Sequence, residues 1–301
     1  MTHDFLLGTA QWGWTVDRDE AFRQLDAWIV AGLRRVDCAT NYPINKNPND
    51  FRAAQNILLE YLKVHPNAPL EITMKIGSLD NLRTPEINLV PSFLLMMGAE
   101  YRRLFGSTLK TVMLHWDKRS DETAIRASLE AMLALQNEEG IAPGLSGIDH
   151  PEVYARAIED YGLQFDIQAK HNIIHSDVAR YAPLQGKGHR FYAYGINAGG
   201  LKLQGLYPAE STLLARGGNP EMVNITVEKI RKKTGAWNLA FVRPPVQNMT
   251  QLGLLYTLGN VQLNGAVLGF SSVRQLEQTM EHIRDLQTFD YTDVYRDLNK
   301  L

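Results

Sequence analysis

The chain has 301 residues, of which 45% are hydrophobic and 21% charged, the balance of an ordinary globular protein that can bury a core of its own. Its formal net charge of -2 gives no long-range attraction to nucleic acid or to an anionic membrane surface, so we expect neither partner. The chain has a single cysteine, which fits a reducing compartment. It has no basic start followed by a long apolar run, and no window approaches the roughly 20 apolar residues of a membrane span. We therefore expect a cytoplasmic protein.

Short apolar runs of strand character alternate with stretches of helical spacing along the chain. The predicted strands are residues 6–10, 33–37, 70–75, 109–115, 143–146, 165–169, 190–194 and 265–269. The first five predicted helices begin near residues 17, 51, 87, 121 and 151. Because strands that alternate with helices form a parallel sheet, and eight of them close into a barrel, we predict an α/β fold. The expected architecture is one (β/α)8 TIM barrel domain over residues 1–301.

Two stretches interrupt this alternation, residues 197–219 and 235–250. Both are rich in Gly, Pro and Asn and are longer than barrel connections need to be. We expect them to form loops over the C-terminal mouth of the barrel rather than linkers to a second domain.

Four chemically active side chains lie at or just after the ends of consecutive predicted strands. Asp37, Lys75 and His115 each close a strand, and Tyr42 follows Asp37 closely. TIM barrels present their catalytic groups at the C-terminal ends of strands. Each residue alone is more often a core or rim residue, or one partner of a structural ion pair, but the ordered set favours a site.

The chemistry of this set suits the delivery of a proton to a carbonyl oxygen. Tyr42 carries a phenol that is protonated at neutral pH, and an ammonium within about 4 to 6 Å would lower its pKa. Asp37 would keep the Lys75 ammonium charged and oriented, while His115 would hydrogen-bond the carbonyl oxygen. The sequence therefore predicts the reduction of a carbonyl that receives a hydride.

Other chemistries have weaker support. Cys38 could be a reactive thiol at a strand end, but a small buried filler is the favoured interpretation. His171 and His175 have the spacing of a metal pair, yet no H-E-x-x-H motif surrounds them, and we predict no metal. Neither a G-x-G-x-x-G motif after a strand nor a P-loop is present.

Motifs over essentially the whole chain resemble those of the aldo-keto reductase superfamily. The segments that carry the resemblance are Leu7-Gly8-Thr9-Ala10-Gln11-Trp12-Gly13, residues 31–42 with Asp37 and Tyr42, Lys75, Leu114-His115-Trp116-Asp117, Gly144-Leu145-Ser146, Gln168 with Asn172, Tyr194 with residues 198–201, and Val267-Leu268-Gly269-Phe270-Ser271-Ser272 followed by Gln275-Leu276-Glu277. The resemblance implies a catalytic tetrad of Asp37, Tyr42, Lys75 and His115 and a nicotinamide cofactor bound without a Rossmann fold.

The resemblance also implies which residues bind the cofactor. These are Gly8, Thr9, Asp37, Ser146, Gln168, Tyr194, Gly269, Ser271, Arg274 and Gln275. Ser146 and Gln168 would hold the carboxamide and Tyr194 would stack on the ring, while the last four match the family's site for the adenosine phosphate end. NADPH is expected more than NADH. The chain departs from the usual pattern at Gly147 in place of Asn, and at Ile196-Asn197, Leu268, Thr279 and Gln55.

The function expected from the sequence is therefore an NAD(P)H-dependent reductase of a small-molecule aldehyde or ketone. Trp12, Lys46 and Trp116 would line the substrate pocket, and the aromatic and polar groups suit a sugar-like or polar carbonyl. One alternative is a cofactor-binding regulatory or redox-sensing subunit with weak turnover. Another is a barrel lyase or isomerase, which would need a metal or a Schiff-base lysine.

Overall fold

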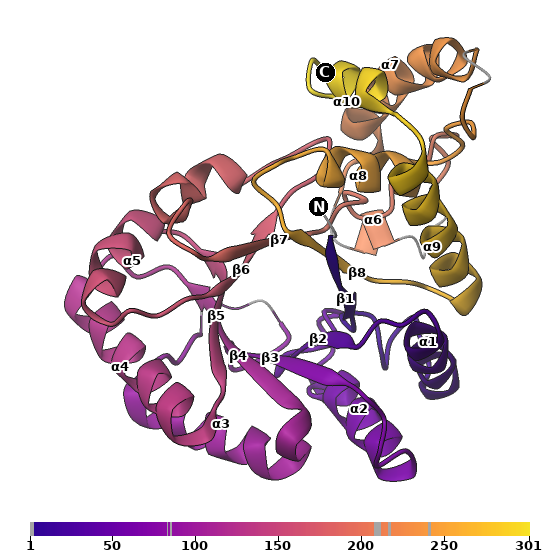
Figure 1. The fold of residues 1–301 in the computed structure, drawn as a ribbon. Coiled ribbons are helices and arrows are strands. Elements are labelled where there is room, and N and C mark those ends of the chain that lie inside the picture. Colours follow the sequence, from indigo (N-terminus) through magenta and orange to yellow (C-terminus); the bar gives the residue numbers. More distant parts are fainter. Residues whose placement is uncertain (1–2, 83, 85, 208–211, 216–217, 240–241) are drawn as a thin grey trace.

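Eight parallel strands form a closed barrel in which each strand pairs with its neighbours in chain order (Figure 1). The structure is a computed structural model that describes residues 3–301 except 83, 85, 208–211, 216–217 and 240–241. Helices surround the barrel, so the predicted (β/α)8 TIM barrel is confirmed. The strands are β1 (Asp4–Gly8), β2 (Arg35–Ala39), β3 (Glu71–Gly77), β4 (Leu109–Asp117), β5 (Ala142–Ile148), β6 (Asp166–Lys170), β7 (Arg190–Tyr194) and β8 (Gly265–Leu268).

The register of the strands places chemically active residues side by side. His115 on β4 lies opposite Ser146 on β5, and Ser146 lies opposite Gln168 on β6. On the other side, Lys75 on β3 pairs with Ala39, the last residue of β2. The C-terminal ends of β2 to β6 therefore meet on one rim of the barrel.

Ten α-helices are described, and several begin at side chains that cap them. They are α1 (Arg18–Val30), α2 (Ala53–Val64), α3 (Pro91–Phe105), α4 (Glu122–Glu139), α5 (Pro151–Ala157), α6 (Thr212–Ala215), α7 (Pro220–Asn238), α8 (Met249–Leu258), α9 (Val273–Thr288) and α10 (Thr292–Leu298). The Asp17 side chain accepts a hydrogen bond from the Glu20 amide, as expected for an N-cap. Helix α3 begins at Pro91 rather than near residue 87, because proline suits the first helical position.

The segment between β7 and β8 is more helical than the sequence indicates. Helix α7 runs through residues 235–238 and α8 begins at Met249, so the prediction of a loop over residues 235–250 is wrong at both ends. Parts of the two expected loops, residues 208–211, 216–217 and 240–241, lie outside the described residues. Helices α7, α8 and α10 share a hydrophobic cluster separate from the main core, built around residues such as Ile230, Leu252 and Val294.

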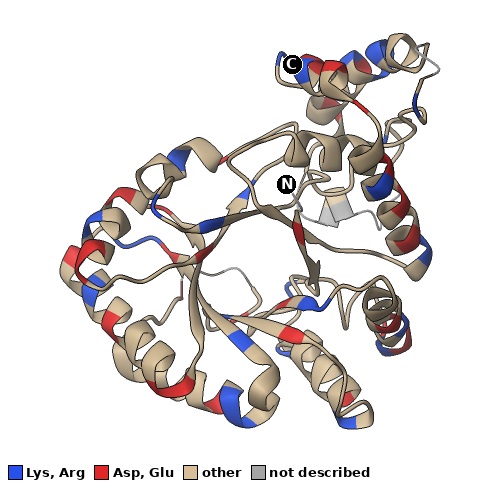
Figure 2. Ribbon diagram, in the orientation of Figure 1, with Lys and Arg blue, Asp and Glu red and all other residues tan. Residues whose placement is uncertain are grey.

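Charges of both signs are interspersed over the outer helices (Figure 2). The strands instead contribute mostly apolar residues to the main core, including Leu7, Val36, Ile72 and Ile167. Among the helices in the described part of the chain, none is long and apolar enough to span a membrane.

Candidate active site at the barrel mouth

The structure brings Asp37, Lys75 and Tyr42 together at β2 and β3. Asp37, Lys75 and His115 do not close their strands as predicted, because β2, β3 and β4 each continue two residues further, to Ala39, Gly77 and Asp117. The side chains of Asp37 and Lys75 are only 2% and 3% exposed, and the Lys75 ammonium donates to Asp37 Oδ2. The Lys75 Nζ atom also lies 4.9 Å from the centre of the Tyr42 ring. Lys75 is therefore placed between an acid and a phenol.

Gln168 connects this ion pair to the neighbouring strands. Its Nε2 atom donates to Asp37 Oδ1 over 2.5 Å, and its Oε1 atom lies 3.3 Å from Lys75 Nζ. The Ser146 hydroxyl is 3.4 Å from the same Oε1 atom. Sequence reasoning assigned Gln168 only to cofactor binding and missed its contact with the ion pair, because the sequence does not show which strands face each other across a barrel.

Burial and charge act in opposite directions on the two proton-carrying groups. Burial alone would lower the pKa of Lys75, but the negative charge of Asp37, then Tyr42, raises it above its usual value. Burial raises the pKa of Tyr42, and the charge of Lys75 only partly opposes this. The expected net lowering of the Tyr42 pKa is therefore not what the structure gives, and the phenol is held protonated at neutral pH.

His115 is a buried imidazole in its neutral form. Burial, followed by the positive charge of Lys75, holds the pKa of His115 well below its usual value. Its Nδ1 atom is buried and has no hydrogen-bond partner in the described part of the protein. The ring lies beside Trp116, with 4.5 Å between the ring centres.

Trp116 also lies against Gly147, the residue that follows Ser146. A Cβ atom at position 147 would come within 2.3 Å of Trp116 Cδ1, and Gly147 has a φ of +67°, which favours glycine. Because position 147 has no side chain, the half-buried indole can occupy this space next to His115.

Trp12 and Lys46, the other two residues assigned to the substrate pocket, differ in how far they are buried. Trp12 is fully buried, and its indole nitrogen donates to Gln24 of α1 over 3.3 Å, so the structure does not place it on an open surface of the mouth. Lys46 is exposed and lies in the loop of residues 43–50. Within that loop Asn45 and Asn47 both donate to Asp50, over 2.5 and 2.9 Å.

The residues assigned to the two ends of the cofactor are also arranged around the mouth. Thr9, which follows Gly8, is buried and donates from its hydroxyl to the Asp37 carbonyl over 3.0 Å. Tyr194 ends β7 and is half-buried. Gly269 and Ser271 follow β8, Gln275 lies in the first turn of α9, and Arg274 is exposed beside it.

The residues considered for other chemistry are held in local contacts. Cys38 is buried, and burial raises the pKa of its thiol to about 11, which fits a filler rather than a thiolate. His171 stacks on Tyr256 and bonds to Ser176, and His175 bonds to Asp177. The described residues contain no cluster of three or more His, Cys, Asp or Glu side chains suited to a metal ion.

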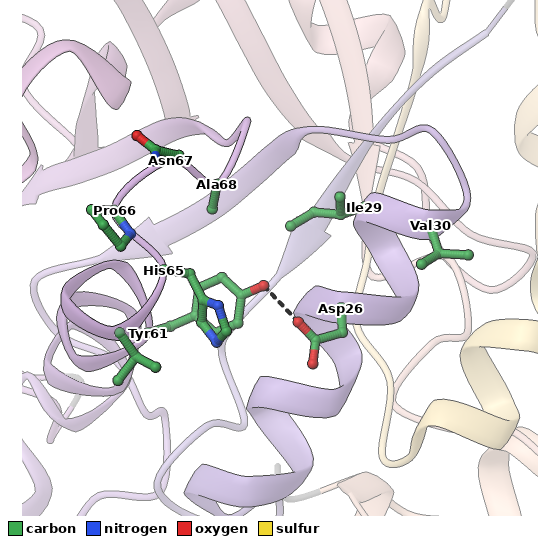
Figure 3. Close-up of a pocket in the computed structure, with 9 residues that line it drawn as sticks. Asp26, Ile29, Val30, Tyr61, His65, Pro66, Asn67 and Ala68 are labelled. Atoms are coloured by element: carbon green, nitrogen blue, oxygen red, sulfur yellow. Dashed lines mark hydrogen bonds between the residues drawn. The ribbon is translucent and has the colours of Figure 1, made fainter.

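One surface hollow lies away from this mouth, where α1 and α2 end and the chain returns to β3 (Figure 3). It measures about 600 Å³ and is lined by side chains that include Ile29, Val30 and His65. Tyr61 donates to Asp26 across it over 2.7 Å. No member of the tetrad lines this hollow.

Comparison with known protein families identifies the family of this chain. The model of the aldo/keto reductase family matches residues 4–295. The chain belongs to the aldo/keto reductase family. Its structure is similar to that of the aldo-keto reductase AKR11C1 from Bacillus halodurans in its holo form, with a TM-score of 0.71 and 16% identity, over 99% of this chain and 91% of that one. At this identity the similarity shows the shared fold alone.

A shorter relative covers only part of this family member. The chain is 35% identical over 75 residues to an uncharacterized 11.2 kDa protein in the crtE 3′ region of Pseudescherichia vulneris. That match spans 24% of this chain and 73% of the relative, whose name states no activity. Membership of the family implies NAD(P)H-dependent carbonyl reduction in general.

Proposed function

We propose that this aldo/keto reductase reduces an aldehyde or ketone to the alcohol, with NADPH preferred as the cofactor and Tyr42 as the proton donor. The observation that carries the proposal is the buried ion pair of Lys75 and Asp37 beside the Tyr42 ring. An ammonium at this distance from a phenol stabilises the phenolate that forms when the proton leaves.

The chain's own groups divide the work of proton transfer. We place the proton of neutral His115 on Nε2, because at Nδ1 it would be a buried donor without an acceptor. The Nε2–H group can then donate to the carbonyl oxygen and orient it toward Tyr42. Tyr42 transfers its proton to that oxygen, and Lys75, held by Asp37, compensates the charge left on the phenolate.

The residues present fit a nicotinamide cofactor. A carboxamide needs both donors and acceptors, and the Ser146 hydroxyl and the Gln168 amide lie 3.4 Å apart on neighbouring strands. Tyr194 offers a half-buried aromatic face for stacking. When bound, the cofactor supplies the hydride. The preference for NADPH rests on the exposed cation of Arg274 near the adenosine end.

The proposed substrate is a polar or sugar-like carbonyl compound. Trp116 presents an aromatic face beside His115, on which a sugar ring can stack. Lys46 and the asparagines of the loop over residues 43–50 supply polar groups near the proton donor. The reducing compartment that a lone buried cysteine fits is the cytoplasm.

A substrate screen tests the proposal directly. Purified protein is incubated with NADPH, and separately with NADH, and the fall in cofactor absorbance is followed for a panel of aldehydes, ketones and sugars. We expect multiple turnovers with at least one class and higher kcat/KM with NADPH. Tight cofactor binding without turnover on any member would instead support the regulatory or redox-sensing subunit.

A further inference from the structure

The N-terminus of helix α9 lies next to the mouth and is a natural place for an anion. Helix α9 follows β8 through the loop of residues 269–272 and begins at Val273. Barrels of this class frequently bind phosphate at the loops after the last two strands and at a helix N-terminus, where amide groups and the helix dipole favour negative charge. The proposed function places the adenosine end of the cofactor here.

In this structure the hydrogen-bond donors of that N-terminus already have acceptors from the chain itself. The Val273 amide donates to Oε1 of Glu20 over 2.5 Å. The amide and hydroxyl of Ser271 both donate to Oε1 of Gln275, over 2.8 and 3.0 Å. The Gln275 amide donates to the Ser272 hydroxyl over 3.3 Å. A carboxylate of the protein therefore occupies the position that attracts an anion.

Glu20 is held firmly in this position by α1, which packs beside α9 (Figure 1). Its second oxygen, Oε2, accepts from Arg23 over 2.6 Å, and its side chain is only 17% exposed. One turn further along α1, the fully buried Gln24 donates to the Phe270 carbonyl over 3.3 Å. Two successive turns of α1 thus hold the loop that precedes α9.

We infer that Glu20 is a specificity-determining residue that weakens binding of the phosphorylated cofactor and so opposes Arg274. A 2′-phosphate near the first turn of α9 meets the negative charge of Glu20 and must compete with it for the Val273 amide. A ribose 2′-hydroxyl carries no charge and can donate to the same carboxylate. The ratio of NADPH to NADH affinity is then set by the negative charge of Glu20 acting against the cations of Arg23 and Arg274. This inference rests on the proposed function.

The test measures binding without turnover. Dissociation constants for NADP+, NAD+, 2′,5′-ADP and 5′-AMP are obtained by titration calorimetry for the wild type and for Glu20→Gln, which keeps an oxygen acceptor for Val273 but removes the charge. We expect Glu20→Gln to bind NADP+ and 2′,5′-ADP about tenfold more tightly, with NAD+ and 5′-AMP changed by less than about threefold.

The matched control is Asp19→Asn. Asp19 lies in the same turn of α1 and carries the same charge, but it is 73% exposed and pairs with Arg18 instead of α9. We expect it to change all four constants by less than about threefold, because exposed charges are screened. A second variant, Arg274→Ala, should weaken NADP+ roughly 10- to 100-fold and leave NAD+ nearly unchanged.

The outcomes separate failure of the inference from failure of the proposed function. If no dinucleotide binds the folded wild type, the proposed function is wrong. If the dinucleotides bind but Glu20→Gln leaves the ratio of NADP+ to NAD+ affinity unchanged, or shifts it no more than Asp19→Asn, Glu20 does not set specificity. If Glu20→Gln does not fold, a Glu20→Asp variant, whose shorter carboxylate moves away from Val273, decides in the same way.

Discussion

Strand β2 contributes to two ionic clusters, one at Arg35 and one at Asp37, which differ in how completely their polar groups are paired. At the start of β2, the Arg35 guanidinium bonds to Asp4, to Asp166 over 2.5 Å and to the Tyr192 hydroxyl over 2.6 Å. Arg190 adds two more bonds to Asp166, over 2.8 and 3.1 Å. This lower cluster joins the first residues of β1, β2, β6 and β7.

The upper cluster, around Asp37 and Lys75, lies only two residues further along β2 but is incompletely paired. His115 Nδ1 and Asn41 Oδ1 are both buried near this end without a hydrogen-bond partner in the described residues. Buried polar groups are normally satisfied, so exceptions need an explanation. The comparison teaches that a buried charge does not by itself mark a site. The cluster that is left incomplete is the one expected to act on a substrate.

The largest effect is expected from Tyr42→Phe, which tests the upper cluster. The variant loses only the transferable proton, so kcat should fall by on the order of 10²- to 10⁴-fold, the usual contribution of a general acid. Cofactor affinity and the melting temperature should stay close to the wild type, since the ring is retained. Steady-state kinetics and thermal melts provide the measurement, and wild-type turnover in this variant would refute the proposed mechanism.

Arg35→Met tests the lower cluster and should have the reverse effect. The change leaves the buried Asp166 with Arg190 alone and the partly exposed Asp4 without an ion pair, which should lower the free energy of unfolding by about 1 to 3 kcal/mol. Because this end of the barrel is remote from the proton donor, kcat per folded molecule should be unchanged. Urea denaturation followed by circular dichroism measures the first quantity. As a control, Arg190→Met removes a cation whose side chain is 56% exposed and should cost less.

The neutral state of His115 predicts a pH dependence of stability. Since its pKa is lowered in the folded protein, the unfolded chain takes up a proton as the pH falls below about 6.5 while the folded protein does not. Stability is therefore lost on acidification, at up to about 1.4 kcal/mol per pH unit from this group. His115→Asn should lose less stability than the wild type between pH 7 and 5.5 in urea titrations. Parallel losses in the two proteins would show that His115 is not the cause.

The smallest effect is expected at the exposed edge of the mouth. Lys46→Ala should raise KM roughly two- to fivefold for an anionic or polyol substrate, the range typical of a surface charge interaction, and leave a small neutral aldehyde unaffected. Kinetics with one substrate of each kind check this. A rise in KM for both would mean that the loop over residues 43–50 has been disturbed, and no rise for either would place substrate selection elsewhere.

The sequence predicts well the alternation of strands and helices and the polar residues that lie near the ends of strands. The alternation of patterns predicted the closed barrel, and β2 and β3 bring Asp37 and Lys75 together as expected, although each strand ends two residues later than predicted. Burial was less predictable. Trp12 belongs to a motif near the mouth, yet it turns inward toward Gln24, and the Tyr42 pKa depends on desolvation that only packing reveals.

Long-range contacts between helices could not be predicted from the sequence either, because they too depend on tertiary packing. The contact of Glu20 with Val273 joins residues 253 positions apart, and no local pattern signals it. The last residues of helix α7 were expected to be a loop because residues 235–250 are rich in Gly, Pro and Asn. The buried face of α7, with Ile230 and Trp237, instead packs with α8 and α10. Tertiary packing overrides weak local preferences in such segments.

The contact between Gly147 and Trp116 has a consequence for how this chain can diverge from its relatives. The resemblance stated in the sequence analysis implies Asn as the usual residue at position 147, but here an added Cβ would meet the indole at 2.3 Å. Introducing Asn at position 147 alone would force Trp116, which packs beside His115, out of its present position. A side chain at position 147 therefore needs a smaller residue at position 116 or another position for the indole, so each residue limits which substitutions the other can accept.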